Sequence, residues 1–207
     1  IRSYMDNSKR QYYKKHLEQI TSFQTSNPNE NPWVLGKPKT EIIDVVDYDP
    51  NWQAQFKQIK QNIQNKLGHK ALAIEHVGST AVSDLSAKPV IDIDLIVKNP
   101  EQELNYAPIL EEFGFLLTVR EPSWYQHRMF RLEQPRVNLH VFGPDCPEHL
   151  RHILFRDWLR THSDDRRLYE EAKKMASVKV TNVQVYNQNK ENVIKEIYDK
   201  IIKTISE

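Results

Sequence analysis

The stretch from Val90 to Val97 places the tightest limit on what this chain can fold into. It reads Val-Ile-Asp-Ile-Asp-Leu-Ile-Val, an apolar run with two carboxylates inside it. Successive side chains of a strand point to opposite faces, so Asp92 and Asp94 share one face while the apolar residues between them enter a core. Two ionised carboxylates this close repel each other unless a cation or hydrogen-bond donors compensate their charge. A divalent metal is the simplest compensator.

A second strand-like run ends at Val77 and is followed by the turn Gly78-Ser79-Thr80. Glycine allows close backbone approach, and N–H groups and hydroxyls at such a turn make an anion-binding concavity. Lys88 adds a positive charge before the second strand. Because Mg²⁺ is usually held by one or two carboxylates together with substrate phosphates, the two runs favour metal-assisted phosphoryl chemistry. The alternative is an ordinary turn beside a solvated Asp-x-Asp.

Four ordered motifs resemble those of the GrpB family, which belongs to the nucleotidyltransferase superfamily, whose members resemble the palm of polymerase β. The motifs are Ile74–Val82, Ala87–Asp94, Val137–Phe142 and Arg151–Arg160. The resemblance extends from about Ile42 to the C-terminus. We therefore expect an N-terminal helical extension and linker over residues 1–40 and a GrpB-like nucleotidyltransferase-fold domain over residues 41–207.

The expected fold class is α+β, with a nucleotidyltransferase-like mixed β-sheet of about five strands backed by helices and with added C-terminal helices. Apolar periodicity and turn residues predict the elements. Strands are expected at residues 41–47, 90–97, 115–120, 127–132 and 136–142, besides the strand-like run that ends at the Gly78 turn. Helices are expected from Asp49-Pro50 to Gly68, from Asn99-Pro100 to Gly114 with Leu104 inward, and over 147–161, 164–177 and 189–206.

The resemblance implies an enzyme that transfers a nucleoside monophosphate from a nucleoside triphosphate to an acceptor hydroxyl or phosphate. The acceptor, whether small molecule, protein or RNA, is not indicated. The implied cofactor is Mg²⁺ or Mn²⁺, and the expected catalytic residues are Asp92, Asp94 and Lys88. The expected metal ligands are Asp92, Asp94 and His140. The expected nucleotide- and phosphate-binding residues are Gly78, Ser79, Thr80, Lys88, Arg128, Arg131 and Arg156.

Active members of the superfamily usually carry a third carboxylate on a later strand. The corresponding strand here has Asn138 and His140 on one face and no acid. His140 is expected either to bind a metal, although imidazole suits Zn, Mn or Fe better than Mg²⁺, or to hydrogen-bond Asp92 or Asp94. The missing acid favours an alternative function, a catalytically silent nucleotide- or phosphate-binding or RNA-associated module on the same fold.

Two basic segments could complete the pocket. On the strand 127–132, Arg128 and Arg131 lie on opposite faces, and a guanidinium fits phosphate well; a solvated edge strand is the alternative. On the helix 147–161, three- and four-residue spacing puts Arg156 on the same face as His149 and His152. A salt-bridged surface helix is the alternative there.

Composition excludes several classes of protein. The chain has 29 basic and 28 acidic side chains, so no whole-protein field attracts nucleic acid. The single cysteine, Cys146, excludes an intrachain disulfide framework. No apolar run approaches the length of a bilayer span, so we expect a cytoplasmic protein without a membrane partner. Asp6 is expected to cap a helix that docks through Tyr13, Leu17 and Ile20, in preference to acting as a basic nucleic-acid arm.

Overall fold

The computed structural model describes residues 4–178 and 183–207. Its strands are β1 (Ala73–Val77), β2 (Ile91–Ile96), β3 (Leu116–Glu121), β4 (His127–Leu132) and β5 (Val137–Phe142). Its α-helices are α1 (Asn7–Lys15), α2 (Leu17–Thr21), α3 (Asn51–Leu67), α4 (Ala107–Glu112), α5 (Pro147–Thr161), α6 (Ser163–Ser177), α7 (Val183–Asn189) and α8 (Glu191–Ser206). Three short 3₁₀ turns are η1 (Gly68–Lys70), η2 (Ser79–Ala81) and η3 (Glu103–Asn105).

The five strands form one mixed sheet in the order β1-β2-β5-β4-β3. Strands β2 and β5 are parallel, and the other neighbouring pairs are antiparallel. The carboxylate strand β2 therefore lies inside the sheet, with β1 on one side and β5 on the other. This sheet confirms the expected α+β class, and the last three strands lie within one residue of their predicted bounds.

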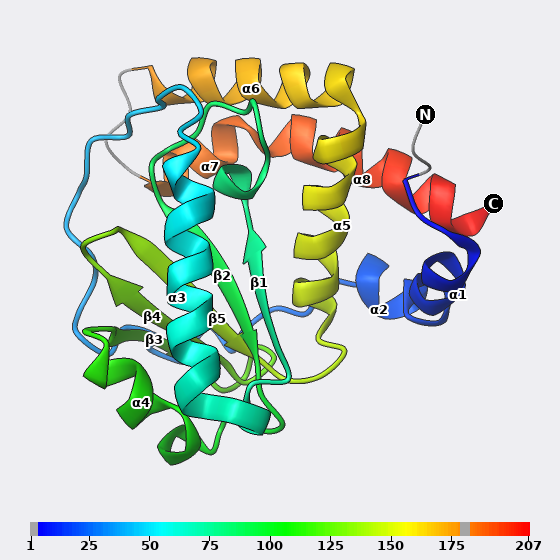
Figure 1. Cartoon of the computed structure of the whole chain (residues 1–207). Helices are drawn as coiled ribbons and strands as arrows, with labels where there is room; N and C mark the ends of the chain where they lie inside the picture. Colours follow the sequence, from blue (N-terminus) through cyan, green and yellow to red (C-terminus); the bar gives the residue numbers. More distant parts are fainter. Residues whose placement is uncertain (1–3, 179–182) are drawn as a thin grey trace.

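One face of the sheet is covered by α3 and α4, as Figure 1 shows for the long helix α3. Helix α3 begins where the Asp49 side chain accepts a hydrogen bond from the N–H of Asn51, and it ends at Gly68 with φ +55°. Its predicted apolar stripe packs on the odd-numbered residues of β2 and β5. The buried core of this face includes Trp52, Ile59, Ile63, Leu67, Ile91, Ile93, Leu95, Phe130, Val137, Leu139 and Val141.

The C-terminal helices and the N-terminal extension form a second apolar cluster, centred on α5 and α8 (Figure 1). Asp6 caps α1 by accepting a hydrogen bond from the N–H of Lys9, as expected. The helical segment breaks at His16 into α1 and α2, and its residues Tyr13 and Ile20 are buried in the cluster. The N-terminal extension thus docks on the C-terminal helices and is not an exposed basic arm.

Two predicted elements are wrong. Residues 41–47 form no strand and make a single bridge, Val46 to Ala87, because the apolar residues Ile43 and Val45 pack against α6 and α7 instead of joining the sheet edge. The helix predicted from residue 99 begins only at Ala107, where Pro108 favours a helix start but cannot lie inside one. Leu104 is consequently 89% exposed, not inward.

None of the described helices is long and apolar enough to cross a lipid bilayer.

Candidate functional site

The face of the sheet opposite α3 carries the polar side chains of β2 in register with those of its neighbours. Asp94 lies between Glu75 on β1 and His140 on β5. Two residues earlier along β2, on the same face, Asp92 lies between Val77 and Asn138. The predicted common face of the two aspartates is present, and α5 supplies the histidines that approach it.

Asp94 is fully buried and is held by two histidines of α5. The Nδ1 atoms of His149 and His152 each lie 2.8 Å from its Oδ2 atom, and the other side of the His152 ring faces Glu148 at 3.3 Å. Although burial opposes ionisation, these histidines hold the pKa of Asp94 well below its usual range. The carboxylates of Asp94 and Glu148 likewise outweigh burial and raise the pKa of His152 to about 10. An imidazolium is therefore the counter-ion of Asp94.

Asp92 differs from Asp94 in having no hydrogen bond or ion pair with any residue of the described segments. Burial is the main cause that raises the pKa of this carboxyl to about 6, and the charge of Asp94 adds to the rise. Gly78 packs directly against it, since a Cβ built on Gly78 would lie 2.5 Å from Asp92 Oδ2. The unpaired carboxylate and the glycine turn thus form one site.

The turn Gly78-Ser79-Thr80 is fixed from inside by Thr80. Its hydroxyl donates to the carbonyl of Val90 at 3.1 Å and therefore accepts from Nε2 of His76 at 2.9 Å. Burial lowers the pKa of His76 to about 3, so this ring is neutral. The expected phosphate-binding hydroxyl of Thr80 is instead a buried structural one, which leaves Gly78 and the partly exposed Ser79 facing the site.

His140 makes neither of the two predicted contacts to an aspartate, and its Nδ1 lies 3.0 Å from Nε2 of His127. Nδ1 of His127 lies 2.7 Å from Glu121. If Glu121 accepts from His127, His140 Nδ1–H donates to His127 and its own Nε2 keeps a free lone pair. Burial is the main cause that lowers the pKa of His140 to about 3, so the ring is neutral at physiological pH.

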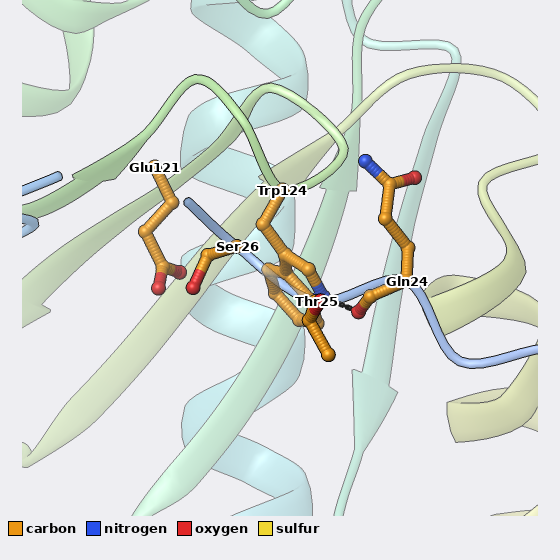
Figure 2. Close-up of a pocket in the computed structure, with 5 residues that line it drawn as sticks. All are labelled: Gln24, Thr25, Ser26, Glu121 and Trp124. Atoms are coloured by element: carbon orange, nitrogen blue, oxygen red, sulfur yellow. Dashed lines mark hydrogen bonds between the residues drawn. The ribbon is translucent and has the colours of Figure 1, made fainter. Parts of the chain in front are cut away.

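Glu121, at the far end of this histidine pair, lines a pocket of about 350 Å³. Figure 2 shows the pocket between the β3–β4 hairpin and the segment 24–26. There Nε1 of Trp124 donates to the carbonyl of Gln24 at 3.0 Å (Figure 2). A hydrogen-bonded chain of two histidines thus connects this pocket with the row of the sheet that holds Asp94.

The predicted basic residues lie in three places, of which two are at the site face and the third, that of Arg128, is not. Lys88 and Arg131 meet at Glu41, beside Asp92. Arg156 donates to Glu75 at 2.7 Å and to the carbonyl of His76 at 2.9 Å, so it positions β1 just before the turn.

Arg128 is the predicted residue that the structure does not bring to the site. Its neighbour Phe130, two residues along β4 on the same side, belongs to the core beneath α3 and α4. The Arg128 side chain is buried and its Nε donates to Glu103 at 2.9 Å. Direct phosphate binding by Arg128 is therefore a wrong prediction, because the pleat of β4 sends alternate side chains to opposite faces of the sheet.

Sequence reasoning missed three residues of this face: Glu75, Arg136 and Glu41. Glu75 supplies a carboxylate beside Asp94 from β1, but Arg156 already neutralises it. Arg136 joins Lys88 and Arg131 at Glu41. The alternation of β1 could have indicated Glu75, whereas no local pattern marks Glu41, which lies in an irregular segment.

The donor set fits a divalent cation that is shared with a substrate, not a complete protein cage. No group of three or more His, Cys, Asp or Glu side chains within residues 4–178 and 183–207 is arranged to hold a metal ion. Within the described residues, Asp92 has no hydrogen-bond partner and Asp94 Oδ1 accepts a single hydrogen bond, from His152 at 3.1 Å, so both aspartates have oxygens left for a cation. Two carboxylates completed by phosphate and water are the usual setting of Mg²⁺.

In EDTA, the substitution Asp92→Asn is expected to stabilise the protein at neutral pH. A carboxyl whose pKa is raised to about 6 disfavours its own ionisation in the folded state, so the wild type loses stability as the pH rises from about 4 to about 6. Asn carries no charge and avoids this loss, which gives an advantage of about 1–2 kcal/mol above that range. Urea unfolding at about pH 4 and about pH 7.5 measures the difference, and equal values at both would contradict a raised pKa of Asp92.

Comparison with known proteins assigns the chain to a family. A family model described as GrpB protein matches residues 42–200. A UPF0157 protein from Halalkalibacterium halodurans is 43% identical over 162 residues, which cover 78% of this chain and 83% of the relative. A dephospho-CoA kinase from Mycolicibacterium paratuberculosis is 27% identical over 183 residues, covering 75% of this chain and 45% of the kinase.

Among solved structures, the conserved protein GrpB from Enterococcus faecalis aligns with a TM-score of 0.69 and 29% identity, over 79% of this chain and 100% of that one. The family match extends over well more than half of the sequence and contains the site face described above. This chain belongs to the GrpB family.

Proposed function

We propose that this protein binds a nucleoside triphosphate at the Gly78 turn and transfers its nucleoside monophosphate to an acceptor, with Mg²⁺ or Mn²⁺ held by Asp92 and Asp94. The observation that carries the proposal is the contact of Gly78 with the unpaired carboxylate of Asp92. It puts a backbone that can approach phosphate closely next to an oxygen donor without a protein partner. Because Asp92 is half-buried, its uncompensated charge costs free energy that a bound cation would offset.

The protein groups around this pair have separate roles in the proposed reaction. His152 and His149 keep Asp94 ionised. The ammonium of Lys88 lowers the pKa of Asp92 and so helps to keep this carboxyl ionised. A bound metal would neutralise the charge that develops on the transferred and leaving oxygens. Gly78 and Ser79 orient the phosphates beside it.

His140 takes the position of the missing third carboxylate in this proposal. It is the β5 neighbour of Asp94, and its Nδ1 is held by His127. The neutral ring leaves the Nε2 lone pair to accept a proton from an acceptor hydroxyl or to join the metal ligands. The substitution His140→Asp restores the usual acid and tests whether this position limits transfer.

A catalytically silent nucleotide-binding module is the second candidate, and one observation favours it. Asp94 already has a complete counter-ion in the imidazolium of His152. A protein that had lost transfer activity could keep this pair for stability and still bind phosphate at the turn.

A binding panel tests the proposal: the four ribonucleoside triphosphates, each with Mg²⁺, Mn²⁺ or EDTA, measured by thermal shift on the wild type, Asp92→Asn and Asp199→Asn. A ligand at about a hundred times its dissociation constant stabilises the native state by roughly 2.7 kcal/mol. We expect metal-dependent stabilisation in the wild type and in the control Asp199→Asn, whose exposed carboxylate lies on α8. In Asp92→Asn we expect the nucleotide affinity in the presence of metal to be at least tenfold weaker.

Two other results of the panel are informative. Stabilisation that is unaffected by Asp92→Asn would overturn the assignment of the site. Nucleotide binding in the wild type without release of pyrophosphate, for any of a set of hydroxyl and phosphate acceptors and also in His140→Asp, would favour the silent module.

A further inference from the structure

Three cationic side chains converge on one carboxylate beside Asp92. Glu41 lies 3.4 Å from Nζ of Lys88, 3.0 Å from Nη2 of Arg131 and 3.1 Å from Nη2 of Arg136. We call Lys88, Arg131 and Arg136 the basic cluster. They come from the segment before β2, from β4 and from the residue before β5, whereas Glu41 comes from an irregular segment outside the sheet.

The basic cluster and the Gly78 turn lie on opposite sides of Asp92. The sheet register puts Val77, Asp92, Asn138 and Arg131 in one row across β1, β2, β5 and β4. Gly78 follows Val77 at one end of that row, and Arg131 lies at the other end. Two anions bound at these places would therefore flank the same carboxylate.

The three positive charges of the basic cluster match the charge of a dianion better than the single negative charge of Glu41. All three cations pair with Glu41, and two of them, Arg131 and Arg136, also pair with Glu133, which is 64% exposed, so that its charge is largely screened. Although burial opposes ionisation, the three cations hold the pKa of Glu41 below its usual range. Nε of Arg136 is buried and has no hydrogen-bond partner within the described residues. Glu41 alone thus leaves positive charge of the basic cluster and the Nε–H donor of Arg136 uncompensated.

We propose that the basic cluster binds the phosphate group of the acceptor, and that Glu41 takes the place of this phosphate when no acceptor is bound. This inference rests on the proposed function, and it names the acceptor class as a phosphorylated molecule. A phosphate dianion carries twice the charge of Glu41 and one more oxygen acceptor, and guanidinium groups bind it in a bidentate manner. Because Glu41 lies in an irregular segment, it can leave without breaking a strand or a helix.

Inorganic phosphate in EDTA is the probe, with affinity measured by isothermal titration calorimetry. Removing the competing carboxylate by Glu41→Gln is expected to tighten phosphate binding at least tenfold over the wild type. Arg136→Gln is expected to weaken it at least tenfold in the Glu41→Gln background, and Lys88→Gln serves if that double variant does not fold. Glu112→Gln is the matched control, because it removes the same charge from an exposed pair with Lys66 and should change affinity less than twofold.

Three outcomes would overturn the proposal. The first is a phosphate affinity in Glu41→Gln within twofold of the wild type. The second is phosphate binding that survives Arg136→Gln but is lost in Gly78→Ala. The third is competition between phosphate and a nucleoside triphosphate that binds with Mg²⁺, since the two anions are assigned to different sides of Asp92. Failure of nucleotides to bind while phosphate behaves as expected would instead contradict the proposed function alone.

Discussion

Replacing Asp94 by Ala is expected to lower the free energy of unfolding by about 3–5 kcal/mol, because it removes one member of a buried ion pair and leaves the other uncompensated. Asp94 is fully buried, and His152 then keeps only Glu148 as a partner. The matched control is Asp92→Asn, which alters the other carboxylate on the same face and is expected to stabilise. Two aspartates on the same face of one strand thus have opposite effects, because Asp94 has hydrogen-bond partners and Asp92 has none within the described residues.

The cost of Asp94→Ala is expected to be largest in a limited pH range. Because the pKa of Asp94 is depressed, its contribution is present above about pH 4 and is lost as the pH falls through its folded pKa. Because the pKa of His152 is raised to about 10, its contribution is complete below about pH 6.5 and is lost as the pH rises through about 10. The difference from the wild type should therefore peak between these limits.

Urea unfolding in EDTA at about pH 3, 5.5 and 9.5 measures this dependence. EDTA removes divalent cations, so the comparison reports the ion pair alone. A loss below about 1 kcal/mol that is the same at all three pH values would show that Asp94 and His152 do not form a charged pair.

Gly78→Ala is expected to remove about 2–4 kcal/mol of stability and to abolish nucleotide binding, because the turn combines backbone strain with overpacking. The backbone of Gly78 has φ 72° and ψ −173°, a region that only glycine adopts readily. A Cβ there would lie 2.5 Å from Asp92 Oδ2 and 3.2 Å from its Cβ. Either the turn or Asp92 must move, and the proposed site is then lost.

Gly68→Ala is the matched control for the backbone contribution. Gly68 also has a positive φ, +55°, but nothing lies within 4 Å of the position of its Cβ. Its substitution is expected to cost about 1 kcal/mol from backbone strain alone. The steric part is isolated by the double variant Gly78→Ala/Asp92→Ala, which should be less destabilised than the sum of the single variants by at least about 1 kcal/mol. Strict additivity in thermal or urea unfolding would contradict the contact between these residues.

The histidines of α5 explain how the chain keeps one of the two carboxylates, Asp94, ionised and buried. A metal was the simplest compensator that the sequence suggested, and for Asp94 the structure supplies a charged imidazole instead. The charge of His152 also acts on Asp92, but Asp92 has no hydrogen bond to a histidine within the described residues and lies against the Gly78 turn. The proposed cation site is therefore centred on Asp92, and the proposed function depends more on this residue than on Asp94.

Much of the fold can be predicted from short-range patterns in the sequence. The apolar stripe of α3, the cap at Asp6 and the strands β3 to β5 follow from patterns of period 3.6 or 2, which act within a few residues. The same local reasoning was wrong for residues 41–47, because an alternating apolar pattern fits a helical surface as well as a sheet edge. It was wrong again before Ala107, where Pro108 decided the start of the helix.

By itself, the sequence determined that Asp92 and Asp94 share a face, that a glycine turn precedes their strand and that histidines share a helix face with Arg156. The tertiary structure decided which partner each charge receives. His149 and His152 reach Asp94 from more than fifty residues away, and Glu41 reaches Arg131 across ninety. Such pairs depend on how α5 and an irregular segment pack on the sheet. Side-chain periodicity fixes only the direction of a group within its own element, so it cannot identify the charge that will face it.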